Sequence, residues 1–323
     1  MEVETFTYHL PEELIAQTPA RPRDSSRLMV VDDGIQHLIF SDMVDLLDRG
    51  DLVIINDTRV VPARLEGTKD TGGRLEFLLH RRSGDVWTAL IKGRPRIGAT
   101  GRIGDVRFEI TGKDGDEWTL LTDPVIGHEE LGSLGHVPLP PYIHSDEGAG
   151  GYQTVYAERP GSIAAPTAGL HFTDGILEKL RAKGVRFGVI TLHIGPGTFT
   201  PVRTEMVEDH VMQAEEYVIP EEVLEAVKDT DRLVCVGTSS VRALETALST
   251  GKRQGSADIF IFPGYEFKAP IDVFLTNFHL PRSAPILMTS AFAGWDRLRS
   301  AYEVAVKERY RFYSFGDAMM IHR

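Results

Sequence analysis

One histidine of the chain lies in a run of small residues. Residues 161–173 read GSIAAPTAGLHFT, with five Gly or Ala residues and a Pro around His171. Small residues weaken helices and strands, so such a run indicates a place where a backbone or a ligand must come close. An imidazole beside a bound ligand can act as a general acid or base. A tight turn with a structural histidine is the alternative interpretation.

Polar residues follow four apolar runs that are typical of buried strands. They are Asn56, Asp57, Thr58 and Arg59 after VII, His193 before the turn GPGTF, Thr238, Ser239, Ser240 and Arg242 after VCVG, and Asn277 and His279 in FLTNFH. In open α/β sheets a ligand binds outside the carboxyl ends of the strands, so these clusters are expected to meet at one site. A cap or a turn explains any one cluster alone, and the two serines suit a helix N-cap.

Several common chemistries lack their sequence motif. The chain has no G-x-x-x-x-G-K-[ST] loop and no G-x-G-x-x-G between a strand and a helix, which argues against P-loop and dinucleotide sites. GTSSV does not match G-x-S-x-G, and neither CxxC nor HExxH occurs. His171, His193, His210 and His279 are spaced too irregularly for a metal signature, and Cys235 in LVCVG is expected to be a buried, inert thiol.

Composition narrows the class of protein. With 323 residues, 42% of them hydrophobic, the chain can bury a core and has room for about two domains. A net charge of −12 argues against binding nucleic acid over the whole surface, but residues 92–102, KGRPRIGATGR, form a local basic cluster. No apolar run approaches the roughly 18 residues of a membrane span and the first residues do not resemble a signal peptide, so a cytoplasmic protein is expected.

The pattern of the chain predicts two kinds of secondary structure. From about Arg64 to Asp123, alternating runs such as RLEFLLH and VRFEITG are separated by SGD, RIGD and KDGD, which predicts antiparallel hairpins. Farther on, strands alternate with helices. The stretch TDGILEKLRAKG predicts a helix with Thr173 as its N-cap and Gly184 at its end, and VRFGVITLH predicts the next strand.

These patterns predict an α/β fold with an insertion. DLVIINDT reads as a buried strand that precedes the hairpins, so the α/β part is expected to be interrupted by them. We therefore predict a discontinuous larger α/β domain, residues 1–63 and 151–323, with an inserted small antiparallel β-barrel domain, residues 64–150.

Eight blocks of sequence, in order, resemble one enzyme family. They are NDTRVVPARL (56–65), GHVPLPPYI (135–143), YQTVYAERPGSIAAPTAGLHFT (152–173), LHIGPGTFTPVR (192–203), VGTSSVRALET (236–246), IFIFPGYEFKA (259–269), TNFHLPRS (276–283) and YRFYSFGDAM (310–319). The family is that of the S-adenosylmethionine:tRNA ribosyltransferase-isomerases of queuosine biosynthesis. The resemblance covers nearly the whole chain, and it implies a discontinuous α/β domain with an inserted β-barrel.

The resemblance implies an unusual reaction of S-adenosylmethionine. Its ribosyl moiety is transferred to 7-aminomethyl-7-deazaguanine at the tRNA wobble position and isomerised, which gives epoxyqueuosine-tRNA, adenine and methionine. S-adenosylmethionine is then a consumed co-substrate, and no prosthetic group or metal is expected. A base must remove the acidic proton of the sugar methylene beside the sulfonium, and the departing adenine needs a proton or a hydrogen bond.

These requirements select candidate residues. The candidates for catalysis are His171, His193, Glu215 and Asp57. The candidates for substrate binding are Asn56, Arg59, Ala165, Pro166, Thr167, Gly169, Phe172, Gly197, Thr238, Ser239, Ser240, Arg242, Asn277 and His279. The methionine carboxylate is expected at the helix N-terminus that follows VCVG, where Arg242 stands nearby.

RNA binding needs a basic path and a pocket for an extruded base. The candidates for the path along the anticodon arm are Arg21, Arg23, Arg27, Arg94 and Arg96. Tyr142, Tyr152 and Tyr156 flank the small-residue run and are candidates for stacking on a base, or for the core. A monomer is expected.

The chain departs from the family pattern at three places. Gln213 stands in DHVMQAEEY where the family usually has a histidine, Pro196 replaces a Leu, and a Trp is missing before the IFI strand. Gln forms hydrogen bonds but does not carry protons. Two alternatives follow: an enzyme of the same fold that uses S-adenosylmethionine with another acceptor, or a non-catalytic RNA-binding module.

Overall fold

The larger part of the chain is organised around a nine-stranded sheet, in a computed structural model that describes residues 1–144, 146–199 and 201–323. The strands are β1 (Arg27–Val31), β2 (Ile35–Ile39), β3 (Leu52–Asn56), β13 (Arg186–Leu192), β14 (Glu215–Val218), β15 (Leu233–Val236), β16 (Gln254–Ala257), β17 (Ile271–Asn277) and β18 (Ala318–His322). Their order is β16-β14-β13-β3-β15-β17-β18-β1-β2. The four central strands, β13, β3, β15 and β17, are parallel, so their carboxyl ends share one edge.

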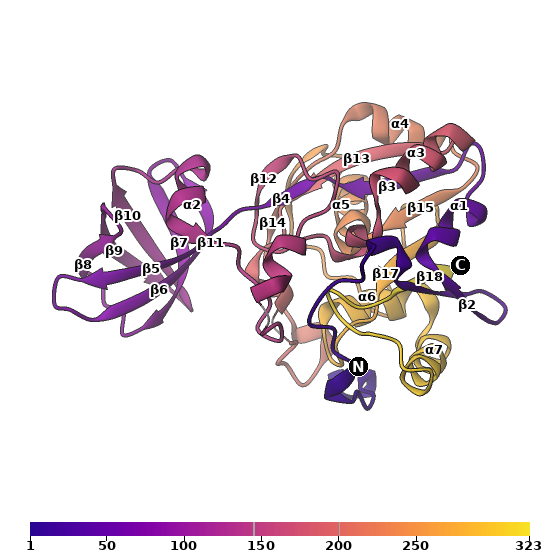
Figure 1. The fold of residues 1–323 in the computed structure, drawn as a ribbon, viewed down its shortest axis with the longest axis horizontal. Coiled ribbons are helices and arrows are strands. Elements are labelled where there is room, and N and C mark those ends of the chain that lie inside the picture. Colours follow the sequence, from indigo (N-terminus) through magenta and orange to yellow (C-terminus); the bar gives the residue numbers. More distant parts are fainter. Residues whose placement is uncertain (145, 200) are drawn as a thin grey trace.

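Helices cover both faces of this sheet (Figure 1). The helices of the larger part are α1 (Met43–Leu46), α3 (Asp174–Lys183), α4 (Glu221–Lys228), α5 (Gly237–Thr250), α6 (Ala284–Ala293) and α7 (Trp295–Lys307). Strand β3 contributes to the hydrophobic cores on both faces of the sheet. Leu52 and Ile54 belong to one core, and Val53 and Ile55 belong to the other. Successive side chains of a strand point to opposite faces, so this wholly apolar strand is buried on both sides.

Two expectations about helix ends have different outcomes. Helix α3 begins after Thr173, whose Oγ1 accepts a hydrogen bond from the Ile176 N–H at 3.3 Å, and it ends before Gly184, as predicted. Helix α5 instead starts at Gly237, directly after its strand. Ser239 and Ser240 therefore lie inside the first helical turn and do not cap the helix.

The hairpins form a closed barrel. Its strands are β5 (Arg64–Lys69), β6 (Arg74–Ser83), β7 (Val86–Gly93), β8 (Thr100–Ile103), β9 (Val106–Asp114) and β10 (Glu117–Asp123), with β11 (Gly135–His136) added to β5 and helix α2 (His128–Leu134) beside it. Pairing of β5 with β8 closes the barrel. Alternate residues such as Leu75, Phe77 and Leu79 fill the interior. The predicted fold class, a discontinuous α/β domain with an inserted antiparallel barrel, is confirmed.

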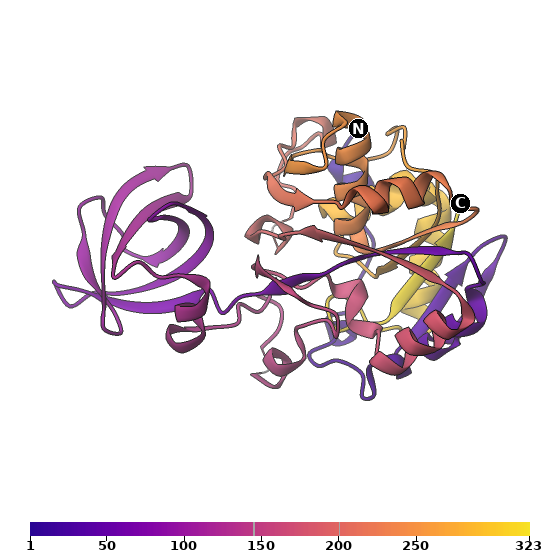
Figure 2. The ribbon, with the colours of Figure 1, turned by 90° about the horizontal axis from the view of Figure 1, so that it is seen from above.

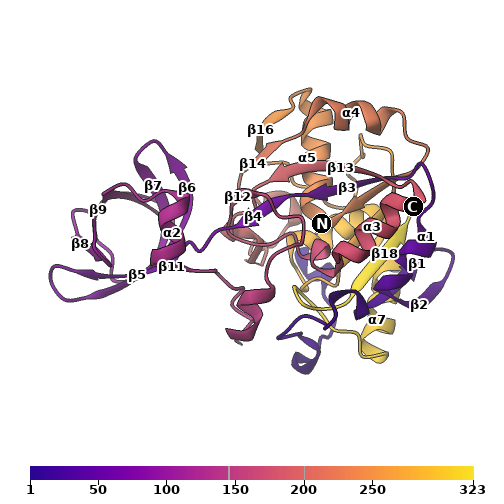
Figure 3. The ribbon, with the colours of Figure 1, turned by 45° about the horizontal axis from the view of Figure 1, so that its top comes forward.

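The chain leaves the α/β layer and returns to it along two neighbouring segments. Strand β4 (Thr58–Val60) leads toward the barrel, and β12 (Arg159–Ser162) leads back and pairs with it in parallel. Figures 2 and 3 show the barrel set apart from the sheet beyond these two strands. Among the described residues, no helix is long and apolar enough to span a membrane.

Candidate active site

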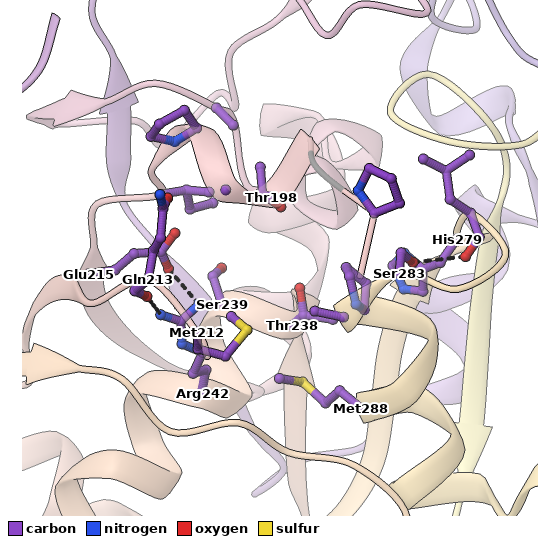
Figure 4. Close-up of a pocket in the computed structure, with 18 of the residues that line it drawn as sticks. Thr198, Met212, Gln213, Glu215, Thr238, Ser239, Arg242, His279, Ser283 and Met288 are labelled. Atoms are coloured by element: carbon purple, nitrogen blue, oxygen red, sulfur yellow. Dashed lines mark hydrogen bonds and ion pairs between the residues drawn. The ribbon is translucent and has the colours of Figure 1, made fainter. Parts of the chain in front are cut away.

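A cavity of about 1120 Å³ lies beside the carboxyl ends of β15 and β17. Much of its α/β wall comes from residues in the segments 164–168, 194–198, 210–215, 237–242 and 276–288. Tyr142, Tyr152 and residues in 201–204, 259–261 and 313–314 add to this wall, and barrel residues around Lys92 and 113–118 complete the cavity. Figure 4 shows Glu215, Gln213 and Arg242 on one side of this space and His279 and Ser283 on the other. The predicted meeting of polar groups at strand ends is therefore realised in part, and the cavity is the candidate active site.

Two helices point their N-termini at the cavity. Thr238 and Ser239 in the first turn of α5 line it, as do Ser283 and Ala284 at the start of α6. Neither helix has a side-chain cap, because Val236 precedes α5 and the Ser283 hydroxyl donates to the Leu280 carbonyl at 2.8 Å. The first N–H groups of a helix are unpaired and carry partial positive charge. This wall is therefore suited to an anionic group.

A buried ion pair joins three segments of the cavity wall. Arg242 Nη1 lies 2.8 Å from Glu215 Oε2, and each side chain is 8% exposed. Arg242 Nη2 donates to the carbonyls of Gln213 and Ala257, and the Gly195 N–H donates to Glu215 Oε1 at 2.8 Å. Burial raises the pKa of Glu215, and the Arg242 guanidinium opposes that shift. The pair thus ties these segments of the wall together, although Arg242 Nε is buried without a hydrogen-bond partner among the described residues.

The end of β17 supplies two more polar groups. His279 Nε2 lies 2.7 Å from Thr276 Oγ1, and burial lowers the pKa of His279 to about 3. Asn277 Nδ2 donates to the Tyr313 carbonyl at 3.0 Å. Asn277 Oδ1 is buried without a hydrogen bond of ordinary geometry, and the Asn277 side chain is close enough to His171 to raise the pKa of that imidazole. Asn277 therefore connects the cavity lining to His171.

Asn56 and Asp57, at the end of β3, tie structural elements together. Asn56 Nδ2 donates to the Leu192 carbonyl at 3.0 Å and to Ser239 Oγ at 3.1 Å, so it links β3 to β13 and α5. Asp57 Oδ1 accepts a hydrogen bond from Thr191 Oγ1 at 2.6 Å, and burial raises the pKa of this carboxyl. Neither residue lines the cavity.

His193 is also held away from the cavity wall. Its Nδ1 lies 2.8 Å from Thr58 Oγ1, and its ring packs on the backbone of Gly161, where a Cβ would approach ring atom Cε1 to 2.9 Å. Burial lowers the pKa of this imidazole. Part of the small-residue run therefore makes room for His193 and not for a ligand.

His171 lies in the interior of the protein. Its Nδ1 is 2.7 Å from Ser26 Oγ, and its ring stacks on Phe40 with centroids 5.0 Å apart. Burial lowers the pKa of His171 to about 3, with Arg311 and Arg23 adding to the shift and Asn277 opposing it. The imidazole is thus neutral at physiological pH and packs in the core behind the cavity wall.

Replacing His171 with Gln is expected to remove part of the acid sensitivity of folding. The unfolded chain takes up this proton near pH 6.5, but the folded chain does so only near pH 3, so His171 stabilises the fold above pH 6.5 and loses that contribution as the pH falls. The wild type should lose about 2 kcal/mol more than the variant between pH 7.5 and 5. Urea unfolding at both pH values measures this difference.

The exposed His9 provides the control for this experiment. The His9→Gln variant should follow the wild type at both pH values, because this side chain is exposed at the surface. An equal loss of stability in His171→Gln and in the wild type would show that His171 takes up its proton in the folded chain.

Comparison with known proteins identifies the family. A model of the family described as "Queuosine biosynthesis protein" matches residues 3–321. The chain belongs to this family. It is 46% identical over 330 residues to the S-adenosylmethionine:tRNA ribosyltransferase-isomerase of Rubrobacter xylanophilus. This alignment covers 99% of this chain and 98% of the relative. It is 47% identical over 336 residues to the protein of the same name from a Sulfurihydrogenibium species, with 99% and 100% covered.

A solved structure agrees with this assignment. The crystal structure of S-adenosylmethionine tRNA ribosyltransferase from Thermotoga maritima matches with a TM-score of 0.57 and 35% sequence identity, covering 98% of this chain and 99% of that one. The family resemblance predicted from the eight sequence blocks is therefore confirmed.

The structure brings only some of the predicted site residues of this queuosine-family chain to the cavity. Those that line it are Ala165, Pro166, Thr167, Gly197, Glu215, Thr238, Ser239, Arg242, Asn277 and His279. Those that lie outside its lining are Asn56, Asp57, Arg59, Gly169, His171, Phe172, His193 and Ser240. Gly169 packs against Tyr156, and Phe172 packs edge-on against Phe40 with centroids 5.0 Å apart, so both serve the interior.

Several lining residues did not stand out in the sequence. His210 and Met212 follow no strand, and Met288 lies in the middle of α6. The nearness of His210 and Met212 to Glu215 in DHVMQAE was the one available signal. A search for polar residues at strand ends does not find residues such as these, because they lie in a loop and in the middle of a helix.

The five arginines predicted to form the RNA path differ in their surroundings, because some have structural partners and others are exposed. Arg23 donates to the carbonyls of Gln153 and Gly151, and Arg27 stacks on the Tyr310 ring at 3.6 Å, so both side chains have structural partners. Arg94 and Arg96 are exposed on the barrel loop after β7, beside the lining residues Lys92 and Pro95. Arg21 is exposed near the N-terminal segment.

Metal ligation finds no support in the described part of the chain. No group of three or more His, Cys, Asp or Glu side chains is placed to hold an ion there. Cys235 is fully buried in β15, and burial raises the pKa of its thiol.

Proposed function

We propose that the chain transfers and isomerises the ribosyl moiety of S-adenosylmethionine onto 7-aminomethyl-7-deazaguanine at the tRNA wobble position. The products are epoxyqueuosine-tRNA, adenine and methionine, and S-adenosylmethionine is a consumed co-substrate. Family membership supports this reaction, and the observation in the fold that carries it is one large cavity with two uncapped helix N-termini in its wall. The reaction takes place in the cytoplasm, where tRNA is found.

In this proposal the methionine carboxylate binds at the N-terminus of α5. The N–H groups of Gly237, Thr238 and Ser239 carry its charge, and the start of α6 adds to the same field. Arg242 supports this wall from behind, because its guanidinium is bound to Glu215 and to two carbonyls. Asn277, which lines the cavity, contacts the nucleoside.

The volume of the cavity supports two substrates. Pockets for one small ligand are typically about 300–1,000 Å³, and this one is about 1120 Å³. An extruded deazaguanine enters between the α/β wall and the barrel, whose residues 64–150 we take as a domain that holds the anticodon arm. Arg94 and Arg96, beside the lining residue Lys92, contact its phosphates, and the enzyme acts as a monomer.

The test is a reaction with defined substrates. Purified protein is incubated with S-adenosylmethionine and an anticodon stem-loop that carries 7-aminomethyl-7-deazaguanine, and adenine and RNA mass are followed by liquid chromatography with mass spectrometry. Adenine and ribosyl-derived RNA product should form in equal amounts. The same stem-loop with guanine at the wobble position should give neither, because it lacks the nucleophilic amine.

Two results would contradict the proposal. S-adenosylmethionine bound without adenine release would point to an enzyme with another acceptor. Binding of the stem-loop that is unaffected by S-adenosylmethionine, again without adenine, would point to an RNA-binding module.

A further inference from the structure

One imidazole on the cavity wall has no role in the site described so far. His210 follows the short helical turn Val207–Asp209, and its N–H donates to the Val207 carbonyl at 3.2 Å. Its ring meets Phe260 edge-on, with centroids 4.9 Å apart and an interplanar angle of 65°. Both residues line the cavity. The ring is thus positioned by packing on one side and faces the space where a substrate binds.

The other titratable groups of the α/β wall are already committed. Glu215 accepts the Gly195 N–H at Oε1 and pairs with Arg242 through Oε2, and the adjacent guanidinium disfavours uptake of a proton by this carboxylate. His279 is held by Thr276, and its pKa of about 3 makes it a weak base. Asp57, His171 and His193, the other candidates for catalysis, lie outside the cavity lining.

The remaining groups of the wall have unsuitable protonation states. Burial raises the pKa of Tyr142 to about 12 and also raises the pKa values of Tyr152 and Tyr313, so all three stay protonated. Guanidinium groups such as Arg203 and Arg242 do not act as bases. On the barrel side, Asp114 and Asp116 are exposed on a turn and Glu117 pairs with Arg81 at 3.3 Å. Within the described lining, both His210 and His279 are neutral, but His279 is bound to Thr276 and is the weaker base, which leaves His210 as the candidate base.

We propose that His210 is the general base that removes the proton from the sugar methylene beside the sulfonium, an inference that rests on the proposed function. A ring nitrogen of His210 takes the proton as the C–H bond breaks, and the electron pair stays on the carbon next to the positive sulfur. The imidazolium formed in this way can then donate a proton to a departing group such as adenine. Gln213, three residues along the same segment, provides hydrogen bonds without taking up a proton.

The surroundings of His210 favour this role. Burial lowers its pKa from the usual value, so the ring is neutral at physiological pH and ready to accept a proton. Burial is the cause of that shift, and neither the adjacent acids Glu208 and Asp209 nor the Glu215–Arg242 pair contributes to it. Phe260, the ring packed against it, carries no charge. A small aromatic contact of this kind orients the ring without taking up its nitrogens.

The test compares His210→Gln with the wild type in the adenine-release reaction. Loss of a general base should lower kcat by at least about 100-fold. The KM values for both substrates should change little, and the fall of kcat/KM at acid pH caused by protonation of His210 should disappear. The matched control is His322→Gln, because His322 is also half-buried with a pKa lowered by burial but lies in β18, outside the cavity lining.

A second variant separates a catalytic role from a structural one. His210→Ala should recover part of its rate when imidazole is added to the reaction, because the small base enters the vacated space. The proposal is overturned if His210→Gln keeps more than a tenth of the wild-type kcat. It is equally overturned if the rate falls while the acid side of the pH profile is unchanged and imidazole does not rescue His210→Ala. Inactive wild type would instead refute the proposed function itself.

Discussion

Replacing Arg242 with Met is expected to lower the free energy of unfolding by about 3–5 kcal/mol. The guanidinium is the charge partner of Glu215 at 2.8 Å and also binds the carbonyls of Gln213 and Ala257. Its loss leaves a carboxylate and two carbonyls buried without that partner. Met fills a similar volume, so the cost is mainly electrostatic. Chemical unfolding followed by circular dichroism measures it.

The pH dependence of this variant identifies the cause. In the folded chain burial already raises the pKa of Glu215, and removing Arg242 takes away the charge that opposes the shift. A carboxyl whose pKa is higher in the folded chain than in the unfolded chain favours folding in its protonated form. Its contribution to the free energy of unfolding is therefore present at low pH and is lost as the pH rises through the folded-state pKa. The loss caused by Arg242→Met should therefore be smaller near pH 5 than near pH 8.

A double variant is the control for Arg242. Glu215→Gln in the Arg242→Met background removes the buried charge and should restore at least half of the lost stability. If the double variant is as unstable as Arg242→Met at both pH values, the unpaired carboxylate is not the cause of the loss.

The second large effect is expected at Gly169. A Cβ added there would clash with Tyr156 Oη and would lie 2.9 Å from Thr154 Cγ2, so the Tyr156 side chain would have to move. Gly169 is buried and Tyr156 is partly buried against the same core, so a Gly169→Ala variant should be destabilised by roughly 3 kcal/mol. The midpoint of urea unfolding measures this change.

Two further variants test the reason for the Gly169 effect. Tyr156→Phe removes the hydroxyl, which is buried without a partner among the described residues, and should reduce the cost of Gly169→Ala by at least about 1 kcal/mol. Gly175→Ala, six residues along in α3, meets its nearest atom at 3.9 Å and should stabilise the fold by about 0.5–1 kcal/mol. An equal cost for Gly169→Ala with and without the Tyr156 hydroxyl would contradict the proposed contact.

The secondary structure and its division into two parts were predictable because their signals are local. Thr173 caps α3 through a neighbouring N–H, and the turn clusters separate the barrel strands as their composition indicated. The position of DLVIINDT before the hairpins indicated that the α/β part is interrupted. Strand β3 then takes the centre of the sheet because it is apolar on both faces.

The structure places some of the predicted strand-end residues in the cavity lining and holds others away from it. Asn277 and His279 follow β17 into the cavity, as expected. Asn56 and Asp57 follow β3 in the same way, but their side-chain oxygens already accept hydrogen bonds within the protein. Asn56 Oδ1 accepts from the N–H groups of Thr58 and Leu192, and Asp57 Oδ1 accepts from Thr191 Oγ1. The identity of a polar residue at a strand end does not reveal whether its hydrogen bonds are already satisfied.

The sequence by itself determined the order and type of the elements, the inserted barrel and the family, because periodicity, caps and long sequence blocks are properties of neighbouring residues. Only the tertiary structure decided which imidazole reaches the cavity. His171 is enclosed by Ser26 and Phe40, whereas His210 packs on Phe260 at the cavity wall. These partners are distant in the chain, so burial, charge state and access depend on packing that no short segment specifies.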